Sequence, residues 1–301
     1  MDWLETYRGT VFRWEVDTVD HFTVAYYFAR LQDATQAMLH ALGLDPAARA
    51  GPGPAAWVTA DCHVRYSREL RVGDVFHVRS GVIDADGHGL RLGHEVVDSG
   101  DGVVCTRAEQ GLALVDLASR ARRPLTAAHR TAAAGHRIDW PADTGAASPL
   151  AHPDGDDGLA EVARDAVKPS EIDTLGEAGL AAYVQRFSAA NAQLLAAFGW
   201  TPAYSRAERR GFSTFEFRLR LPGYLRAGDL ACVRSGLLHL GNSSLRILHR
   251  LANARTGEVV ATLEQAGVHF DMDARRPTPL PAALRERAAT MLLSRPPGVS
   301  S

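Results

Sequence analysis

The hydrophobic positions of this chain follow a helical period and then a strand period, and this order occurs twice. Apolar side chains between residues 24 and 42 recur at three-, four- and seven-residue spacing, which predicts an amphipathic helix. Gly43 follows it, at the position where a left-handed cap favours glycine. After the helix, alternating β-branched runs separated by glycine-containing turns predict four strands. These runs lie near residues 57–66, 75–83, 89–97 and 103–115.

The second half of the chain repeats this order about 155 residues later. A helical stripe spans residues 180–198 before Gly199, and strand-like runs lie near residues 212–221, 230–238, 244–252 and 258–270. Single residues recur as well: Asp17, Tyr27 and Arg30 return as Asp173, Tyr183 and Arg186, and the run Val78–Gly81 returns as Val233–Gly236. A period of this length indicates a duplicated domain, because solenoid repeats are about 20–50 residues long.

Each copy is therefore expected to hold a first strand, a long helix and four further strands, the last of which are antiparallel neighbours joined by short turns. One long helix against an antiparallel sheet is an α+β unit. We expect domains at residues 1–125 and 164–290, a linker at residues 126–163 that is rich in Ala, Gly, His, Asp and Pro, and a flexible tail at residues 291–301. Two such copies predict a pseudo-dimer with a site between its halves.

The composition limits the classes of function. The 301 residues carry a formal net charge of -2, so neither nucleic acid nor an anionic membrane is an expected partner. No apolar stretch approaches the ~18 residues of a membrane helix, and residues 1–5 do not resemble a signal peptide, so we expect a cytoplasmic protein. The cluster Asp154–Asp157 lacks the spacing of a calcium loop, and no Cys/His set has zinc spacing, so no metal and no cofactor are expected. Three cysteines are expected to be buried free thiols: Cys62, Cys105 and Cys232.

Two aspartates, Asp17 and Asp173, are the first candidates for chemistry, since each precedes a long helix. We expect each carboxylate at the end of the first strand of its copy, facing the positive end of the helix dipole. An ionised carboxylate there can attack a carbonyl carbon or activate a water molecule, and free helix amides can stabilise the oxyanion of a thioester. The alternative is that Asp17 only caps the helix or the turn.

The run from Val16 to Tyr27, V-D-T-V-D-H-F-T-V-A-Y-Y, resembles the signature V-D-Y-N-G-H-M-N-V-A-Y-Y of hot-dog-fold acyl-CoA thioesterases. The resemblance is greatest to the branch that includes betainyl-CoA thioesterases, with 4-hydroxybenzoyl-CoA thioesterases as more distant relatives. It extends through residues 33–35, 42–44, 61–70, 94–95 and 115–117, and more loosely through the second copy. It implies two hot-dog domains in tandem, and it implies that Asp17 supplies the catalytic carboxylate as nucleophile or general base. Asp20 and Thr23 depart from the family's Gly and Asn.

The same resemblance points to further site residues. His21 would bind the thioester carbonyl or orient Asp17, or would only cap the start of the helix. Asp61 and His63 share one strand face and would shape the site, or would simply satisfy each other. The residues expected to bind substrate are Thr23, Val24, Ala25, Tyr27, Asp61 and His63, with the amides near Val24 and Ala25 as the oxyanion donors.

The second copy is expected to be degenerate, so that the first copy provides the main site. Glu177 replaces His21 and places a second negative charge near Asp173, which is unfavourable to a developing anion. Pro169 is expected to interrupt the strand that leads to Asp173. Two further replacements are Gly179 for Thr23 and Arg218 for His63. Other repeated residues are assigned to structure: His94 and His249 as sheet residues, and Arg71–Asp74 and Arg226–Asp229 as hairpin turns.

The sequence thus predicts hydrolysis of an acyl thioester of coenzyme A or of a carrier protein, with a homodimer of the tandem unit as an expected assembly. One alternative is a hot-dog hydratase or dehydratase acting on an acyl thioester. Such relatives carry H-x-x-x-G or D-x-N-P-x-H sequences, and the run from His21 to Ala25 matches neither. The other alternative is a non-catalytic acyl-binding or tailoring protein, supported by the loss of the family's Gly and Asn.

Overall fold

The computed structural model describes residues 3–44, 54–87, 89–141 and 155–294. The chain divides into two compact units, and the division does not follow the two sequence copies completely. One unit holds Met1–Asp143 together with Ile172–Ala181, and the other holds Thr144–Glu171 together with Ala182–Ser301. The loop that carries Asp173 therefore belongs to the first unit. The expected domain boundaries at residues 125 and 164 stay a prediction, as does the pseudo-dimer.

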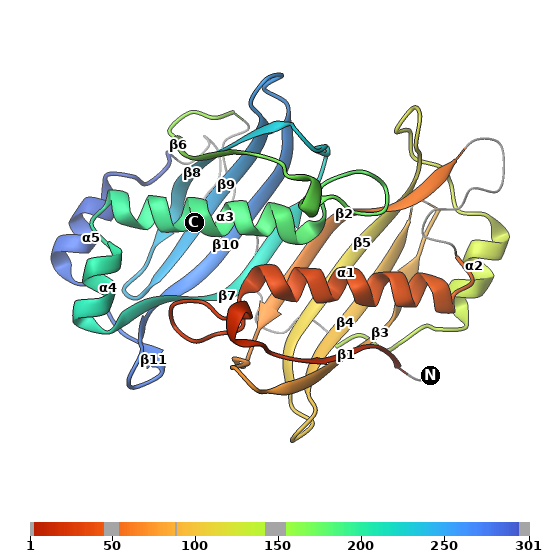
Figure 1. The fold of residues 1–301 in the computed structure, drawn as a ribbon, viewed down its shortest axis with the longest axis horizontal. Helices are drawn as coiled ribbons and strands as arrows, with labels where there is room; N and C mark the ends of the chain where they lie inside the picture. The colour runs from red at the N-terminus through yellow and green to blue at the C-terminus, as the bar shows by residue number, and fades with distance from the viewer. Residues whose placement is uncertain (1–2, 45–53, 88, 142–154, 295–301) are drawn as a thin grey trace. The chain divides into compact units, whose positions relative to one another are not determined.

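The first copy is an antiparallel sheet with one long helix lying across it (Figure 1). The strands follow the order β1-β3-β4-β5-β2 in the sheet, and each neighbouring pair is antiparallel. The elements are β1 (Leu4–Thr10), the 3-10 helix η1 (Arg13–Glu15), α1 (Val24–Ala41), β2 (Ala55–Tyr66), β3 (Val75–Ala85), β4 (Leu90–Asp98), β5 (Val104–Asp116) and α2 (Ala127–Ala134).

The second copy has the same connectivity, with the order β6-β8-β9-β10-β7 and a short strand β11 on β10. Its elements are β6 (Ala160–Ala166), the 3-10 helix η2 (Pro169–Glu171), α3 (Leu180–Ala197), α4 (Pro202–Glu208), β7 (Arg210–Arg220), β8 (Leu230–Leu240), β9 (Ser244–Asn253), β10 (Val259–Asp271), β11 (Arg276–Pro277) and α5 (Ala282–Ala289). Tyr27 and Tyr183 are the fourth residues of α1 and α3, so the duplication and the α+β class are confirmed.

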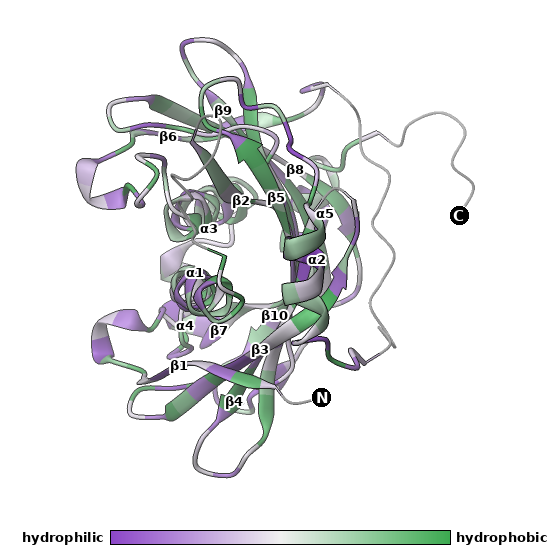
Figure 2. Cartoon of the chain, turned by 90° about the vertical axis from the view of Figure 1, so that its right-hand side faces the viewer, coloured by the Kyte–Doolittle hydropathy of each residue, from purple (hydrophilic) through white to green (hydrophobic). Residues whose placement is uncertain are grey.

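The long helix forms because its apolar stripe is buried against the sheet. Phe28, Leu31 and Met38 of α1 are at most 1% exposed, and they follow the spacing seen in the sequence. Gly43 ends the helix with a φ of +66°, the left-handed conformation that glycine adopts without strain. Figure 2 shows hydrophobic stretches along the strands, among them β4 and β9, and eight consecutive residues of β9 are buried.

A polar pair is buried under the helix in both copies. The Ser80 hydroxyl is bonded to His94 Nδ1 at 2.7 Å, and the Ser235 hydroxyl to His249 Nδ1 at 2.6 Å. Both histidines are 0% exposed, so they are sheet residues as the sequence predicts. Each side chain therefore belongs to the packed interior of its copy, where a charge is costly.

The segment that follows α2 was expected to be linker, yet part of it is packed against the sheet. His136 and Ile138 exchange main-chain hydrogen bonds with Val82, each at 2.9 Å. A Cβ on Gly81 would lie 2.3 Å from Ile138 Cγ2, and a Cβ on Gly236 would lie 2.6 Å from Leu293 Cδ2. The glycine of the repeated Val-Arg-Ser-Gly run thus leaves room for a covering segment in each copy.

Several short elements have no period long enough to be read from the sequence. Helix α2 lies inside the expected linker, and its cap is the Thr126 hydroxyl, which accepts a bond from the His129 amide at 3.2 Å. Helix α4 likewise starts at Pro202 after Thr201. The repeated Arg-x-Gly-Asp turns do build hairpins, as predicted: Gly73 and Gly228 have φ values of +90° and +87°.

Candidate active site

The structure corrects the predicted position of Asp17. Strand β1 ends at Thr10, so Asp17 does not lie at the end of a strand. The chain instead turns through η1, and a β-bridge between Val16 and Phe22 then closes a tight loop. Asp17 opens this loop by donating its amide to the His21 carbonyl at 2.9 Å. The carboxylate is therefore carried by a short loop directly before α1.

One carboxylate oxygen of Asp17 holds the loop together. Asp17 Oδ1 accepts the Val19 amide at 2.9 Å and the His21 amide at 3.0 Å. The second copy has the same arrangement, because Asp173 Oδ1 accepts the Leu175 and Glu177 amides at 2.8 and 3.2 Å. The capping role is thus real in both copies. Among the described residues no group donates a hydrogen bond to Asp17 Oδ2, so this oxygen remains for chemistry.

The loop also explains a departure from the family signature. Asp20 adopts a φ of +60°, and its counterpart Gly176 a φ of +78°. The family's glycine is the residue that takes this left-handed conformation without strain, and Asp is among the few other residues that tolerate it. Asp20 pairs with Arg13 at 3.2 Å on the surface. The replacement of Gly by Asp therefore keeps the shape of the loop and adds a negative charge.

The environment raises the pKa of the Asp17 carboxyl above its ordinary value. The largest cause is desolvation, since the surrounding protein displaces part of its hydration even though water reaches the side chain. The amide and charge of His21 and the Val19 amide oppose this by lowering the pKa, whereas the charge of Asp20 raises it. A carboxylate with a raised pKa is a stronger base once it is ionised.

His21 is held by a carboxylate that the sequence did not single out. His21 Nε2 lies 2.7 Å from Glu69 Oε2. The Phe22 amide donates to the Leu70 carbonyl at 2.7 Å, and this main-chain bond brings the two preceding residues together. Glu69 lies inside the run 61–70 that resembles the family, but the sequence has no signal for a contact between positions so far apart.

The first turn of α1 presents the two amides expected to bind an oxyanion. Thr23 precedes the helix, and its side chain makes no capping hydrogen bond. The first intrahelical donor of the turn is Tyr26, which bonds the Thr23 carbonyl at 2.9 Å. The amides of Val24 and Ala25 have no acceptor among the described residues. They can therefore donate to a negatively charged oxygen of a ligand.

A buried ion pair fixes this loop to the helix in both copies. Arg30 of α1 is ion-paired with Glu15, which is 2% exposed, and the Glu15 carbonyl accepts the Thr23 amide at 2.8 Å. In the second copy Arg186 pairs with Glu171 at 2.9 Å. The recurrence of Arg30 as Arg186 thus has a structural cause.

Three of the predicted substrate-binding residues have contacts that favour other roles. Tyr27 is 3% exposed and packs in the core against Phe22 and Tyr66, which favours a packing role. Asp61 and His63 do share one face of β2, opposite the buried Cys62 and Val64. Asp61, however, is ion-paired with Arg91 at 3.1 Å. The acid that contacts a histidine at this site is Glu69.

The second copy differs from the first at three of these positions. Glu177, at the position of His21, is 2.7 Å from Arg120 Nη1, so its negative charge is paired. The Leu180 amide, which corresponds to the Val24 amide, donates to Gln32 Oε1 at 3.2 Å. Tyr224 stands at the position of Glu69. The predicted interruption by Pro169 is wrong, because Pro169 begins η2 just as Arg13 begins η1.

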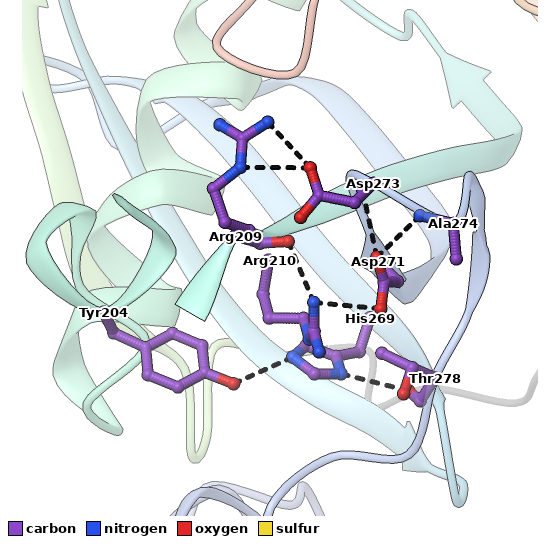
Figure 3. A network of polar contacts seen from close by, with 8 residues as sticks. All are labelled: Tyr204, Arg209, Arg210, His269, Asp271, Asp273, Ala274 and Thr278. Atoms are coloured by element: carbon purple, nitrogen blue, oxygen red, sulfur yellow. Dashed lines mark hydrogen bonds and ion pairs between the residues drawn. The ribbon is translucent and has the colours of Figure 1, made fainter. Parts of the chain in front are cut away.

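Figure 3 shows a separate polar network that belongs to the second copy. The buried His269 donates from Nδ1 to the Thr278 carbonyl at 3.0 Å, so its Nε2 accepts the Tyr204 hydroxyl, also at 3.0 Å. Arg210 and Asp271 are ion-paired beside it at 3.0 Å. Burial lowers the pKa of His269. These contacts fasten α4 and the chain after β11 to β10, and the first copy has Leu114 at the matching position.

Other sequence expectations concern metals, cysteines and membranes. The described residues contain no group of three or more His, Cys, Asp or Glu side chains placed to hold a metal ion. Asp156 of the acidic cluster pairs with Arg234 at 2.6 Å, whereas Asp154 lies outside the described residues. Cys62, Cys105 and Cys232 are buried and free. In the part of the chain that the structure describes, no helix has the length and apolarity needed to span a membrane.

Comparison with known structures agrees with the fold. The acyl-ACP thioesterase of Bacteroides thetaiotaomicron is 14% identical, with a TM-score of 0.63 over 87% of this chain and 96% of its own. The 12:0-ACP thioesterase of Umbellularia californica is 16% identical, with a TM-score of 0.65 over 87% of this chain and 92% of its own. These likenesses confirm the tandem hot-dog architecture.

Comparison of sequences points to the same class of protein. The betainyl-CoA thioesterase of Pseudomonas aeruginosa is 30% identical over 114 residues, which are 38% of this chain and 71% of that protein. A family model, the thioesterase-like superfamily, matches residues 11–147 and again residues 167–288. Each segment of the family match contains the loop that carries Asp17 or Asp173 and the long helix that follows it. The chain therefore belongs, in both of its copies, to the thioesterase-like superfamily.

Proposed function

We propose that this protein hydrolyses an acyl thioester and that the Asp17 carboxylate carries the reaction. The observation that supports this role is that the two carboxylate oxygens of Asp17 have different surroundings. Oδ1 is fixed by the Val19 and His21 amides, while Oδ2 accepts no hydrogen bond among the described residues. The carboxylate is thus rigidly oriented, as catalysis requires, and still has an oxygen that can act.

Two routes use the same oxygen. As a general base, Oδ2 removes a proton from water while the water oxygen attacks the thioester carbon, and the C–S bond then breaks to release a thiolate. As a nucleophile, Oδ2 forms a mixed anhydride with the acyl group and expels the thiolate, and water then hydrolyses the anhydride. In either route the amides of Val24 and Ala25 stabilise the negative oxygen on the former carbonyl.

The substrate class is a thioester of coenzyme A or of a carrier protein. The similar proteins include a betainyl-CoA thioesterase and a 12:0-ACP thioesterase, so both kinds of carrier occur among them. A panel of acyl thioesters of both carriers, followed by release of free thiol, identifies the carrier and the acyl group. A shift in the absorbance of an enoyl thioester without thiol release would instead identify the hydratase alternative.

The decisive variant is Asp17→Asn. The side-chain carbonyl oxygen of the new amide can still accept the Val19 and His21 amides, so the loop and the fold should be preserved. Turnover should fall by at least about 10²-fold, the lower range for a positioned acid or base. Unchanged thiol release from a substrate that the parent protein hydrolyses would refute the role of Asp17. In single-turnover hydrolysis in H₂¹⁸O, label in the Asp17 carboxylate identifies the nucleophilic route with water attacking the Asp17 carbon of the anhydride, since the general-base route places the label only in the product acid.

A further inference from the structure

We propose that Glu69 is a positioning residue for this reaction, holding the imidazole of His21 next to the Asp17 loop. The inference rests on the proposed function and extends it to a residue outside the family signature run. Glu69 has no counterpart in the second copy, where Tyr224 occupies the matching position. It acts through His21 and does not need to touch the substrate.

The contact between the two side chains is built into the main chain. The Phe22 amide binds the Leu70 carbonyl, and Leu70 is 0% exposed, so this point of the Asp17 loop is anchored to the core. The hairpin turn that begins at Arg71 follows immediately and fixes the direction of the chain. His21 and Glu69, the residues before the anchored pair, therefore meet with their side chains 2.7 Å apart.

A carboxylate at this distance has a chemical effect on the imidazole. Glu69 Oε2 accepts a hydrogen bond from His21 Nε2, which fixes the orientation of the ring and places a negative charge beside it. The His21 side chain is 15% and the Glu69 side chain 30% exposed, so solvent screens the pair only partly. Arg71 Nε lies 3.6 Å from Glu69 Oε1 and places a further positive charge beside the carboxylate.

His21 in turn acts on Asp17. His21 donates its amide to Asp17 Oδ1, so the two residues are held together by the loop itself. The positive charge of His21 lowers the pKa of Asp17, against the effects of desolvation and of Asp20, which raise it. Glu69 therefore helps to keep Asp17 ionised, which both routes of hydrolysis require.

The second copy supports the view that histidine and glutamate act as a pair. The positions of His21 and Glu69 are Glu177 and Tyr224 there, so both partners are replaced together. Asp173 is kept, with the same two amide bonds as Asp17. The shape of the loop therefore does not require the His–Glu pair. We attribute the presence of this pair in the first copy to its effect on Asp17.

The test is a double-mutant cycle on kcat with the full chain and the best thioester of the panel. Glu69→Gln keeps the size of the side chain and removes its charge. We expect kcat to fall about 10–100-fold, by analogy with the range for carboxylates that orient metal-binding histidines, with little change in KM. The acid limb of the kcat/KM profile should move to higher pH, because a weaker positive charge on His21 lets the pKa of Asp17 rise. The double variant His21→Asn/Glu69→Gln should be no slower than His21→Asn alone.

The control is Glu5→Gln, which removes an exposed carboxylate paired with Arg8 at 2.6 Å and should leave kcat unchanged. Parental kcat in Glu69→Gln, an unmoved acid limb, or losses that multiply in the double variant would each overturn the proposal. If Glu69→Gln does not fold, Glu69→Asp replaces it in the cycle, since it shortens the side chain and breaks the contact. A parent protein that releases no thiol from any thioester would overturn the proposed function itself.

Discussion

Acid should destabilise this protein through two buried histidines, His94 and His249. Each is 0% exposed, and burial lowers the pKa of each from its ordinary value of 6.5 to about 4, while the neighbouring glutamine side chain opposes the shift. A histidine with a depressed pKa is neutral in the folded protein and protonated in the unfolded chain as the pH falls. Above pH 6.5 protonation of these histidines therefore costs no folding stability. As the pH falls from 6.5 towards 4, the free energy of unfolding decreases.

The size of the loss follows from the two pKa values. At pH 5 the unfolded imidazole is almost fully protonated and the folded one is about 90% neutral, which corresponds to about 2 kcal/mol for each histidine. The two sites lie in different copies, so their effects should add to about 4 kcal/mol. That is a large part of the roughly 5–15 kcal/mol of a typical domain.

The assay is urea unfolding at pH 7.5 and pH 5 for the parent and for His94→Gln, His249→Gln and the double variant. Glutamine does not titrate and can still bond the serine hydroxyl, so each single variant should reduce the pH-dependent loss by about 2 kcal/mol. His40→Gln, at an exposed position of α1, is the matched control and should leave the loss unchanged. If the double variant loses as much stability as the parent between the two pH values, the reasoning is refuted.

Three further outcomes are expected. Asp173→Asn should retain most of the thiol release that Asp17→Asn abolishes; equal losses in initial rate would mean two working sites. Asp20→Gly removes the charge that raises the pKa of Asp17 and suits the left-handed φ, so the acid limb of kcat/KM should move to lower pH, and an unmoved limb would contradict this. Gly81→Ala forces its new methyl against Ile138, and thermal unfolding should show a loss of about 1–3 kcal/mol, with parental stability as the contrary result.

The main elements could be predicted because their signals are local. A 3.6-residue stripe identifies α1 wherever the helix packs, and the repeat of Asp17 as Asp173 identifies the loop. The partner of His21 could not be predicted, since a main-chain bond between Phe22 and Leu70 decides it and no periodicity records such a bond. The expected position of Asp17 at the end of the first strand was wrong for a related reason: the three residues of 3-10 helix between β1 and Asp17 are too short to leave a pattern.

The Gln32 carboxamide on the Leu180 amide has a consequence for how many substrates one chain can process. In a symmetric dimer of identical subunits, a side chain that binds the oxyanion amides of one subunit also binds those of the other. Such a residue would block both active sites and inactivate the enzyme. Joining the copies in one chain removes that constraint. The residue matching Gln32 is Ser188, whose hydroxyl donates to the Val184 carbonyl within its own helix. A transition-state analogue should accordingly titrate one equivalent per chain, and fusion is what made that stoichiometry possible.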